Sequence, residues 1–285
     1  MARRAPQVLA AIVLVALAAA GYASWRLWLK SDDLLRPVVV LRGADAAALV
    51  APPLGARVAA LLGRSRVPAA ARPKLVALTF DDGPYPVTTP LLLQVLHDTD
   101  VAATFFLIGR DAEQYPGLTR AIAQSGHEIA DHTLTHPDLD RLPDAAVAGE
   151  LRDGAVSLER IAPDSAERRL FRPPHGRYSL ATIRVAQASG FDTILWSDDP
   201  GDWRAVPVTA LRDHLLSRAT APEIVLLHSG RQATVAVLPE VIAAYRRAGF
   251  RFVTVGELLR RVPADQLNHP AKLPLAQGNL AGESR

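Results

Sequence analysis

The stretch Thr79-Phe80-Asp81-Asp82-Gly83-Pro84 places two adjacent carboxylates at the end of an apolar segment. The preceding run, Lys74-Leu75-Val76-Ala77-Leu78, is typical of a buried strand, and the Gly-Pro pair after the carboxylates stops a strand and starts a turn. In α/β folds, functional groups gather where such strands open into loops. Two neighbouring carboxylates repel each other, and a bound cation relieves that repulsion. A solvated Asp-Asp-Gly turn is the alternative for this stretch taken alone.

The length and composition restrict the class of protein. A chain of 285 residues with 49% hydrophobic content can bury one large core, so we expect one domain of about 200 residues with extensions. The net charge is only +3 and the arginines are scattered, which does not favour nucleic-acid binding. Because the chain has no cysteine, disulfides and thiolate metal sites are excluded, and any metal must use His, Asp or Glu.

Residues 1–30 are predicted to be a membrane anchor or a signal peptide. Arg3 and Arg4 precede an uncharged, mostly apolar run from Val8 to Trp25 that is long enough to span a bilayer. Aromatic residues at the far end of this run suit a membrane–water interface, and the early arginines place the N-terminus inside. We therefore expect a single-pass protein of the cell membrane with its domain outside the cytoplasm. Secretion after cleavage near Ala18-Ala19-Ala20 is the alternative.

The rest of the chain divides into three parts. Residues 31–73, with the apolar run Val38-Val39-Val40-Leu41 and several prolines, are predicted to be a linker or stalk. Residues 262–285 have no apolar period and are predicted to be a disordered tail. Between them, residues 74–261 alternate strand-like and helix-like segments. This alternation predicts a parallel α/β sheet, open or closed into a barrel, with six or seven β–α units.

The expected elements follow from apolar periodicity and turn residues. The predicted strands are 76–80, 103–108, 127–131, 170–172, 193–196, 224–227 and 250–255. The predicted helices are 89–98, 115–125, 145–161, 180–188, 208–218, 235–247 and 257–261.

A histidine pair follows one of these strands, in Asp131-His132-Thr133-Leu134-Thr135-His136-Pro137. The two histidines are four residues apart, so one helical turn would place both imidazoles on one face. Two histidines and one carboxylate are a common open site for a divalent cation. Since His132 and His136 follow a strand as the paired aspartates do, both motifs are expected at one end of the fold. Two unconnected surface or core histidines are the alternative.

Three further motifs each follow a predicted strand. In residues 171–178, Arg172 can hold a carboxylate through its planar guanidinium. Residues 196–203 hold three aspartates and two tryptophans, which suit the orientation of a histidine or arginine and stacking on a sugar ring. In residues 224–230, His228 at the end of an apolar strand suits a general acid or base. Taken singly, these motifs also fit a rigid loop, a packed turn and a structural histidine.

Together and in this order, the five motifs resemble the polysaccharide deacetylase family, the carbohydrate esterases of family four whose catalytic domain is named for the chitooligosaccharide deacetylase of nodulation. The similarity runs from about Lys74 to Arg261 and includes Gly126-His127-Glu128 and residues 249–255. The resemblance implies a distorted, incomplete (β/α) barrel with about seven strands. It also implies a metal at the C-terminal ends of the strands, usually Zn²⁺ and sometimes Co²⁺ or another divalent ion.

The resemblance further implies a role for each matching residue. The expected metal ligands are Asp82, His132 and His136. The expected catalytic groups are Asp81 as general base, Arg172 as the residue that holds it, His228 as general acid and Asp202 as its orienting partner. The expected substrate contacts are the backbone N–H of His175, Trp203 and Leu226, with Asp199 as a more distant acid. The family usually has Tyr or Phe at the position of His175, and an apolar residue at that of Asp198.

The function that the resemblance implies is hydrolysis of N-acetyl groups on an extracytoplasmic glycan that contains N-acetylglucosamine. Peptidoglycan is favoured because the domain is expected to face the wall or periplasm. Chitin-like oligomers, poly-N-acetylglucosamine and O-acetylated xylan remain open as substrates. A non-catalytic glycan-binding domain and an amidase for non-sugar amides are the alternatives of other classes. We expect a monomer.

Overall fold

The computed structural model describes residues 40–41, 72–163, 169–267 and 271–272. The predicted anchor in residues 1–30 and most of the predicted linker lie outside the described residues. Within the described part of the chain, no helix is both long enough and apolar enough to cross a membrane.

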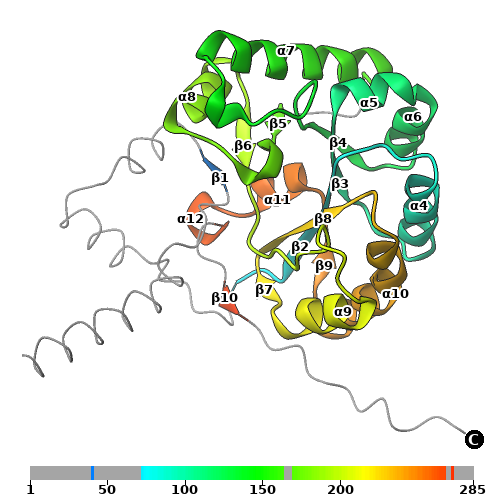
Figure 1. Ribbon diagram of the computed structural model, residues 1–285. Helices are drawn as coiled ribbons and strands as arrows, with labels where there is room; N and C mark the ends of the chain where they lie inside the picture. Colours follow the sequence, from blue (N-terminus) through cyan, green and yellow to red (C-terminus); the bar gives the residue numbers. More distant parts are fainter. Residues whose placement is uncertain (1–39, 42–71, 164–168, 268–270, 273–285) are drawn as a thin grey trace, which may run out of the picture. The chain divides into compact units, whose positions relative to one another are not determined.

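A parallel sheet of short strands forms the centre of the domain (Figure 1). All seven residues of the central strand β2 are buried, as expected for a strand that is covered on both faces. The sheet order is β6-β5-β4-β3-β2-β8, and β9 pairs with the first residues of β2. The parallel strands are β2 (Leu75–Asp81), β3 (Thr104–Leu107), β4 (Glu128–Asp131), β5 (Leu170–Phe171), β6 (Asp192–Ile194), β8 (Glu223–His228) and β9 (Arg251–Phe252).

The sheet curls until the chain after β6 reaches β8. Asp198 and Val225 form a parallel bridge, in which the Leu226 N–H donates to the Asp198 carbonyl at 2.9 Å. The Asp198 N–H in turn donates to the Ile224 carbonyl at 3.2 Å. The result is the curled, incomplete α/β barrel that the family resemblance implies.

Helices surround the curled sheet, and the sheet separates two apolar layers. Alternate strand residues point to opposite faces, so Phe80 and Phe105 pack under the helices while Ala77 and Phe106 pack inside the curl. The helices on the outside are α4 (Thr88–Asp98), α5 (Gly109–Gln114), α6 (Pro116–Gln124), α7 (Asp144–Ile161), α8 (Leu180–Ala188), α9 (Val208–Ser217) and α10 (Gln232–Arg247). The predicted helices are therefore confirmed, and α5 is an additional one.

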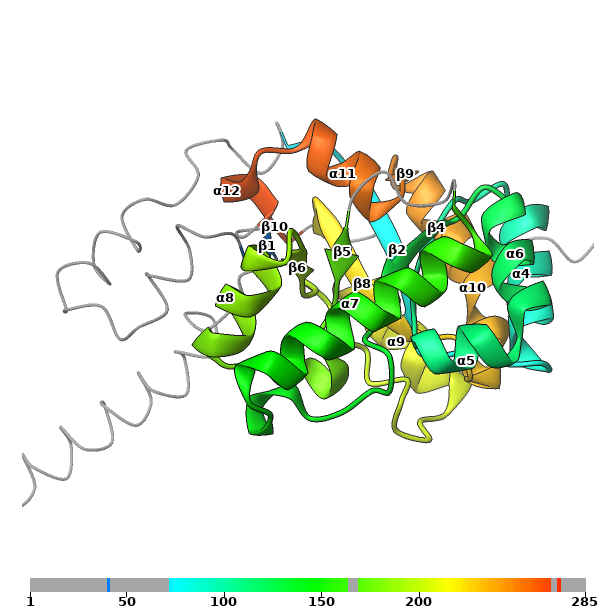
Figure 2. The ribbon, with the colours of Figure 1, turned by 90° about the horizontal axis from the view of Figure 1, so that it is seen from above.

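Helix α11 (Val255–Arg261) covers the end of the curl at which the strands begin, on the side opposite α5 (Figure 2). The Gly256 N–H donates to the Glu128 carboxylate at 3.0 Å, and the Val255 N–H donates to the Thr104 hydroxyl at 2.8 Å. Thr104 also donates to Glu128 at 2.7 Å. These bonds satisfy the first backbone donors of α11 and leave the other end of the strands for the functional site.

The prediction of a disordered tail over residues 262–285 is wrong for part of that range. Residues Ala264–Leu267 form α12, and β10 (Ala271–Lys272) pairs antiparallel with β7 (Thr220–Ala221). Leu267 is 3% exposed and belongs to the apolar layer inside the curl, which explains why this segment folds against the domain. Likewise, β1 (Val40–Leu41), within the predicted linker, pairs antiparallel with β6.

A buried acid lies at the start of β8. Glu223 is 1% exposed, and its Oε1 accepts hydrogen bonds from the Thr220 N–H and hydroxyl at 3.1 and 3.3 Å. Burial, together with the nearby charge of Asp198, raises the pKa of Glu223 to about 8. Asp198 itself accepts a hydrogen bond from His214 Nε2 at 2.8 Å. Glu223 therefore keeps its proton at neutral pH.

This proton makes the stability of the domain depend on pH. The unfolded side chain loses its proton near the ordinary pKa of 4.5, whereas the folded one holds it to about pH 8. Between these values the unfolded state binds fewer protons, so stability falls by roughly 1.4 kcal/mol per pH unit as the pH rises. Glu223→Gln keeps an acceptor oxygen but cannot ionise. The free energy of unfolding of this variant, relative to that of the native chain, should therefore rise by roughly 1.4 kcal/mol per pH unit over this range.

Urea unfolding between about pH 5 and pH 8 measures this difference. Glu240→Gln, at an exposed position of α10, is the matched control and should differ from the native chain by a constant amount. A constant difference for Glu223→Gln as well would contradict the shifted pKa.

Candidate active site

Four of the predicted site residues lie at or just after the ends of adjacent strands. Asp81 ends β2, and His228 ends β8 directly beside it in the pairing register. His132 follows β4, and Arg172 follows β5, the next strand in the sheet. Because parallel strands end at the same edge of a sheet, residues far apart in the sequence meet there, as the sequence predicts.

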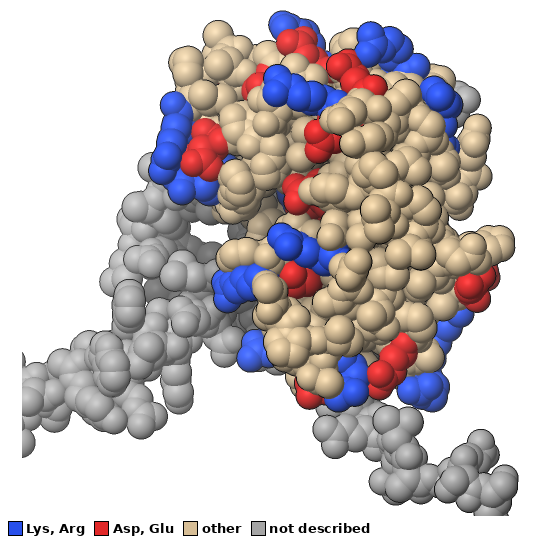
Figure 3. Space-filling view, turned by 45° about the vertical axis from the view of Figure 1, so that its right-hand side comes forward, with Lys and Arg blue, Asp and Glu red and all other residues tan. Residues whose placement is uncertain are grey.

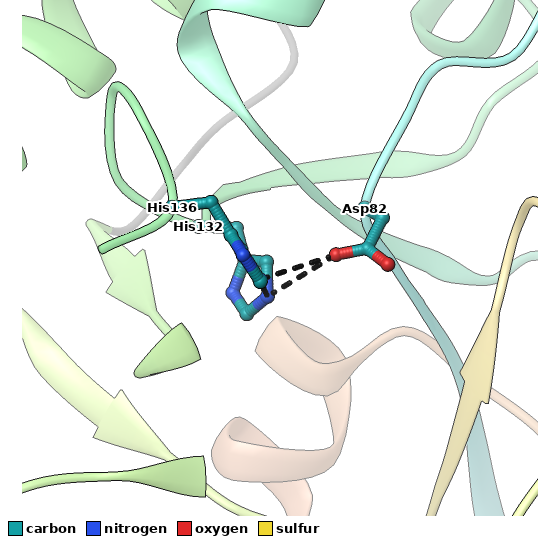
Figure 4. A group of neighbouring side chains, drawn as sticks. All are labelled: Asp82, His132 and His136. Carbon is teal, nitrogen blue, oxygen red and sulfur yellow. Dashed lines mark hydrogen bonds and ion pairs between the residues drawn. The ribbon is translucent and has the colours of Figure 1, made fainter. Parts of the chain in front are cut away.

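The expected metal ligands converge. Asp82, His132 and His136 each offer a ligand atom, and these atoms lie within 4.8 Å of one another. The Asp82 Oδ1 atom lies 3.3 Å from His136 Nε2 and 3.7 Å from His132 Nε2, and the two nitrogens are 3.2 Å apart. Figure 4 shows both imidazoles directed at the carboxylate. This donor set suits a divalent cation such as Zn²⁺.

The surroundings of His132 leave its metal-facing nitrogen with a lone pair. Its Nδ1 lies 2.8 Å from the Arg172 carbonyl, which can only accept, so the proton is on Nδ1. Burial lowers the pKa of His132 to about 3, which keeps the imidazole neutral. A neutral imidazole whose other nitrogen donates to a carbonyl is the usual form of a metal-ligating histidine. The residues present therefore fit a divalent metal.

The predicted helical turn from His132 to His136 is wrong. These residues form a loop in which Thr133 and His136 have positive φ angles of 70° and 61°. Within the loop the His136 N–H donates to the Thr133 hydroxyl at 2.9 Å. Its backbone also bonds to neighbouring helices, because the Gly109 N–H donates to the Thr133 carbonyl at 2.9 Å and the Leu134 N–H to the Glu150 carbonyl at 3.1 Å. The imidazoles thus converge through contacts with α5 and α7.

Helix α7 passes this loop at Gly154. A Cβ atom at Gly154 would lie 2.5 Å from Asp131 Oδ1 and 2.9 Å from the Thr133 carbonyl carbon. Asp131 has no room to move, since it is 3% exposed and its Oδ1 accepts a hydrogen bond from the Thr133 N–H at 2.9 Å. Gly149, on the same helix, has only a distant contact, with Arg152 at 4.0 Å.

Alanine at these two positions should have opposite effects. Gly154→Ala forces the histidine loop away from α7, and overpacking of this kind costs about 1–3 kcal/mol of stability. Gly149→Ala should stabilise by about 0.5–1 kcal/mol, because alanine favours a helix. Urea unfolding measures both, and a zinc titration should show weaker binding for Gly154→Ala only. Equal stabilisation by the two changes would contradict the close approach of α7.

Arg172 and Asp81 form a buried ion pair. Arg172 is fully buried, and its Nη1 donates to Asp81 Oδ1 at 2.6 Å and to the Thr79 hydroxyl at 2.8 Å. Its other nitrogens donate to the carbonyls of Ile194 and Leu195, and its guanidinium lies 4.0 Å from the centre of the Phe106 ring. Burial raises the pKa of Asp81, and the charge of Arg172 opposes that shift. The orientation of the Asp81 carboxylate is therefore fixed.

His228 and Asp202 form a second pair. Asp202 Oδ1 lies 2.8 Å from His228 Nδ1, and its Oδ2 accepts from the His228 N–H at 2.8 Å and from Thr234 at 2.7 Å. Burial alone would lower the pKa of His228, but the hydrogen bond to Asp202 and the charges of Asp81 and Asp202 raise it above its ordinary value. His228 therefore holds a proton more readily than a free histidine, and its Nε2 is the nitrogen left to donate one.

The remaining predicted residues surround these groups. The His175 ring meets the His136 ring edge-on with centroids 4.5 Å apart, and its Nδ1 lies 2.9 Å from Asp138 Oδ1. Leu226 is 4% exposed on β8, and Trp203 is 43% exposed with its ring against Arg204. Asp199 Oδ1 accepts from the Gly201 N–H at 2.8 Å, which shapes the loop between β6 and α9. Among the described residues, no hydrogen bond or ion pair joins Asp199 to the other predicted site residues.

Sequence reasoning missed the residues that support the two buried pairs. Thr79 accepts a hydrogen bond from the Arg172 guanidinium, and Thr234 donates one to the Asp202 carboxylate. The Asp138 carboxylate lies beside His175 Nδ1. Thr79 could have been found from the sequence, because it lies two residues before Asp81 and so on the same face of the strand. Thr234 lies on α10, and its contact with Asp202 depends on how that helix packs.

Comparisons with known proteins agree with this geometry. Residues 69–194 match the family model described as polysaccharide deacetylase. A peptidoglycan-N-acetylglucosamine deacetylase of Bacillus cereus is 38% identical over 192 residues, which are 66% of this chain and 89% of that protein. A chitooligosaccharide deacetylase of Sinorhizobium fredii is 37% identical over 189 residues, with 66% and 84% covered.

A solved structure has the same fold. The crystal structure of the Bc1960 peptidoglycan N-acetylglucosamine deacetylase superposes with a TM-score of 0.64 at 31% identity, covering 67% of this chain and 90% of that one. The relatives are similar over most of their own length, and the family match covers Asp81, His132 and Arg172 but ends before His228. The chain therefore belongs to the polysaccharide deacetylase family and is a hydrolase that acts on amide bonds.

Proposed function

We propose that this protein removes N-acetyl groups from an extracytoplasmic polysaccharide that contains N-acetylglucosamine, with peptidoglycan as the favoured substrate, and releases acetate. The observation that carries the proposal is the meeting of three groups at one edge of the sheet. These are the ligand set around Asp82, the Arg172–Asp81 pair and the Asp202–His228 pair. The two relatives named above, one for peptidoglycan and one for chitooligosaccharide, support this substrate class. Chitin-like oligomers, poly-N-acetylglucosamine and O-acetylated xylan are the alternatives.

In this proposal Asp82, His132 and His136 hold a divalent cation, with Zn²⁺ as the first choice and Co²⁺ or another divalent ion as alternatives. When bound, such a cation polarises the acetyl carbonyl and lowers the pKa of water. The neutral state of His132 and the nearby carboxylate support this assignment.

Asp81 acts as the general base in this proposal. Its Oδ1 is bound by Arg172, while its Oδ2 faces the ligand set, 3.8 Å from His132 Nε2. Arg172 thus aims the second oxygen at the place where the attacking water would stand, and Asp81 takes the proton of that water. The fixed geometry avoids a reorientation of the carboxylate during the reaction.

His228 acts as the general acid. Asp202 holds Nδ1, so Nε2 can deliver a proton to the leaving amine, which otherwise leaves poorly. The hydrogen bond to Asp202 raises the pKa of His228, which favours the protonated imidazole that this role requires. The backbone N–H of His175 stabilises the developing oxyanion, Leu226 and Trp203 receive the acetyl methyl, and the exposed Trp203 face suits a sugar ring. Asp199 supports the loop that carries Asp202.

A non-catalytic glycan-binding domain would not need this arrangement. Burying the Arg172–Asp81 pair costs desolvation energy, and perturbed pKa values gathered in one site are typical of catalysis. An amidase for non-sugar amides would use the same chemistry, and substrate assays separate it from the deacetylase. For location we propose a single-pass cell-membrane protein with its domain outside, or secretion after cleavage as the alternative, and a monomer.

Acetate release from N-acetylglucosamine oligomers and from peptidoglycan tests the proposal. The full chain is stripped of metal and refilled with zinc, and zinc-dependent release from either substrate is the expected result. His136→Ala should lose zinc and activity together, whereas His97→Ala, at an exposed position of α4, should keep both. Zinc binding without acetate release from any glycan would indicate that the site acts on another acyl substrate. A chain that binds no zinc would contradict the proposed metal site.

A further inference from the structure

One short segment concentrates positive charge. Between Arg246 and Arg261 the sequence has five arginines and one glutamate, a formal charge of +4, whereas the whole chain has +3. All five arginines are exposed, and they lie at the end of α10, on β9 and at the end of α11. On the face in Figure 3, by contrast, basic and acidic side chains lie beside one another.

Two of these arginines, Arg251 and Arg261, line an open hollow of about 360 Å³, which we call the basic hollow. Three of its six lining residues are cationic. A backbone hydrogen bond holds Lys74 and Arg251 side by side, because the Arg251 N–H donates to the Lys74 carbonyl at 2.9 Å. The Lys74 side chain is held as well, since its Nζ donates to the Ala248 carbonyl at 2.8 Å. The lining residues are Pro73, Lys74, Leu75, Gly249, Arg251 and Arg261.

The basic hollow and the active site lie at opposite ends of the strands. Lys74 precedes the first residue of β2 and Arg251 pairs beside it, whereas Asp81 is the last residue of β2. Figure 2 shows β9 and α11 on one side of the sheet and α5 on the other. At the active-site end, the part-exposed Asp138 lies 3.4 Å from Arg141 and 3.6 Å from Arg177, so acidic and basic side chains are paired there. Net positive charge is thus concentrated at the end at which the strands begin, and such a distribution orients a protein in an electric field.

We propose that the basic hollow and the arginines around it bind the phosphate groups of anionic lipids at a bilayer surface. The domain then rests on the membrane by the end at which its strands begin, and its active site faces away. Clustered lysines and arginines are attracted to anionic lipid surfaces. Pro73, which lines the hollow, leads into β2. The apolar run from Val8 to Trp25 lies earlier in the sequence, on the N-terminal side of Pro73.

This docking goes beyond the proposed reaction and does not depend on it, although both place the protein at a membrane. Removing the three cations of the basic hollow should therefore leave acetate release from soluble oligomers unchanged. The test variant is Lys74→Gln with Arg251→Gln and Arg261→Gln. The matched control removes three exposed positive charges from α5 and α7, through Arg110→Gln, Arg152→Gln and Arg160→Gln.

The absence of native cysteine allows one fluorophore to report the orientation of the full chain. A single cysteine is placed at Ala248, beside the basic hollow, or at Gln114, at the end of α5. The full chain is reconstituted in nanodiscs of phosphatidylcholine with or without phosphatidylglycerol, and quenching by a headgroup-labelled lipid is measured. We expect strong quenching at position 248 in anionic discs only, and weak quenching at position 114 in both kinds of disc. At high salt, the difference between the two positions and the difference between the two lipid compositions should both disappear.

The test variant should lower the docking equilibrium constant on the order of a hundredfold at low salt, and the control variant should leave it nearly unchanged. Equal quenching in neutral and anionic discs, or equal effects of the two variants, would overturn the proposal. A thermal-shift titration with inorganic pyrophosphate completes the test. Pyrophosphate binding that the test variant abolishes, without any response to anionic discs, would show that the hollow takes a free phosphate anion and not a bilayer.

Discussion

Asp81→Asn is expected to lower kcat/KM for acetate release about a hundred- to ten-thousandfold, the usual contribution of a general base, while zinc stays bound. The asparagine side chain can still accept the hydrogen bond that Arg172 Nη1 now gives to Oδ1 at 2.6 Å. Its amide, however, cannot take a proton from water. The three proposed ligands, Asp82, His132 and His136, are all unchanged by this substitution.

Asp82→Asn provides the comparison, because it removes the negative ligand that lies 3.3 Å from His136 Nε2. Zinc affinity should fall in this variant, and activity should return in part when zinc is in excess. Activity and metal content are measured on the same samples of both variants. Zinc lost from Asp81→Asn and kept by Asp82→Asn would reverse the roles that we propose for the two neighbouring carboxylates.

Arg172→Met is expected to lower the free energy of unfolding by about 3–5 kcal/mol, because it leaves a buried carboxylate without its partner. Arg172 is fully buried and its guanidinium makes contacts with two carboxyl or hydroxyl groups and two backbone carbonyls. Activity should fall as well, since nothing then fixes the direction of Asp81. Urea unfolding and acetate release measure the two effects.

The double variant Arg172→Met with Asp81→Asn separates stability from catalysis. It removes both charges, so most of the lost stability should return, whereas activity should stay as low as in Asp81→Asn alone. If the double variant is no more stable than Arg172→Met, the unpaired buried carboxylate is not the cause of the lost stability. If the double variant is as active as the native chain, neither residue acts in the reaction.

Much of the fold could be predicted because its signals are local. An apolar run such as Val76–Phe80 is typical of a strand, and Asp82 and Gly83, with φ angles of 67° and 72°, end it in the turn that the Gly-Pro pair predicts. Repeated β–α units require a parallel sheet, and parallel strands end at one edge. The placement of Asp81, His132, Arg172 and His228 at one edge of the sheet follows from these rules.

The same local signals misjudged segments whose structure depends on distant partners. The loop from His132 to His136 has the spacing of a helical turn, but α5 and α7 bind its backbone and hold it in another form. Leu267 lies in a segment without an apolar period, yet it is buried because it packs against the apolar residues inside the curl. Contacts of this kind connect residues that no short window of sequence contains.

The sequence by itself determined the order of the strands along the chain, the residue types at their ends and the absence of any thiolate ligand. Only the tertiary structure decided which atoms of those residues face one another. Arg172 donates a hydrogen bond to Oδ1 of Asp81, and the Asp202 carboxylate contacts Nδ1 of His228. Gly154 has no side chain and so leaves room for the histidine loop. The physical reason is that periodicity and turn chemistry act over a few residues, whereas burial, pKa and the placement of charge depend on everything packed around a group.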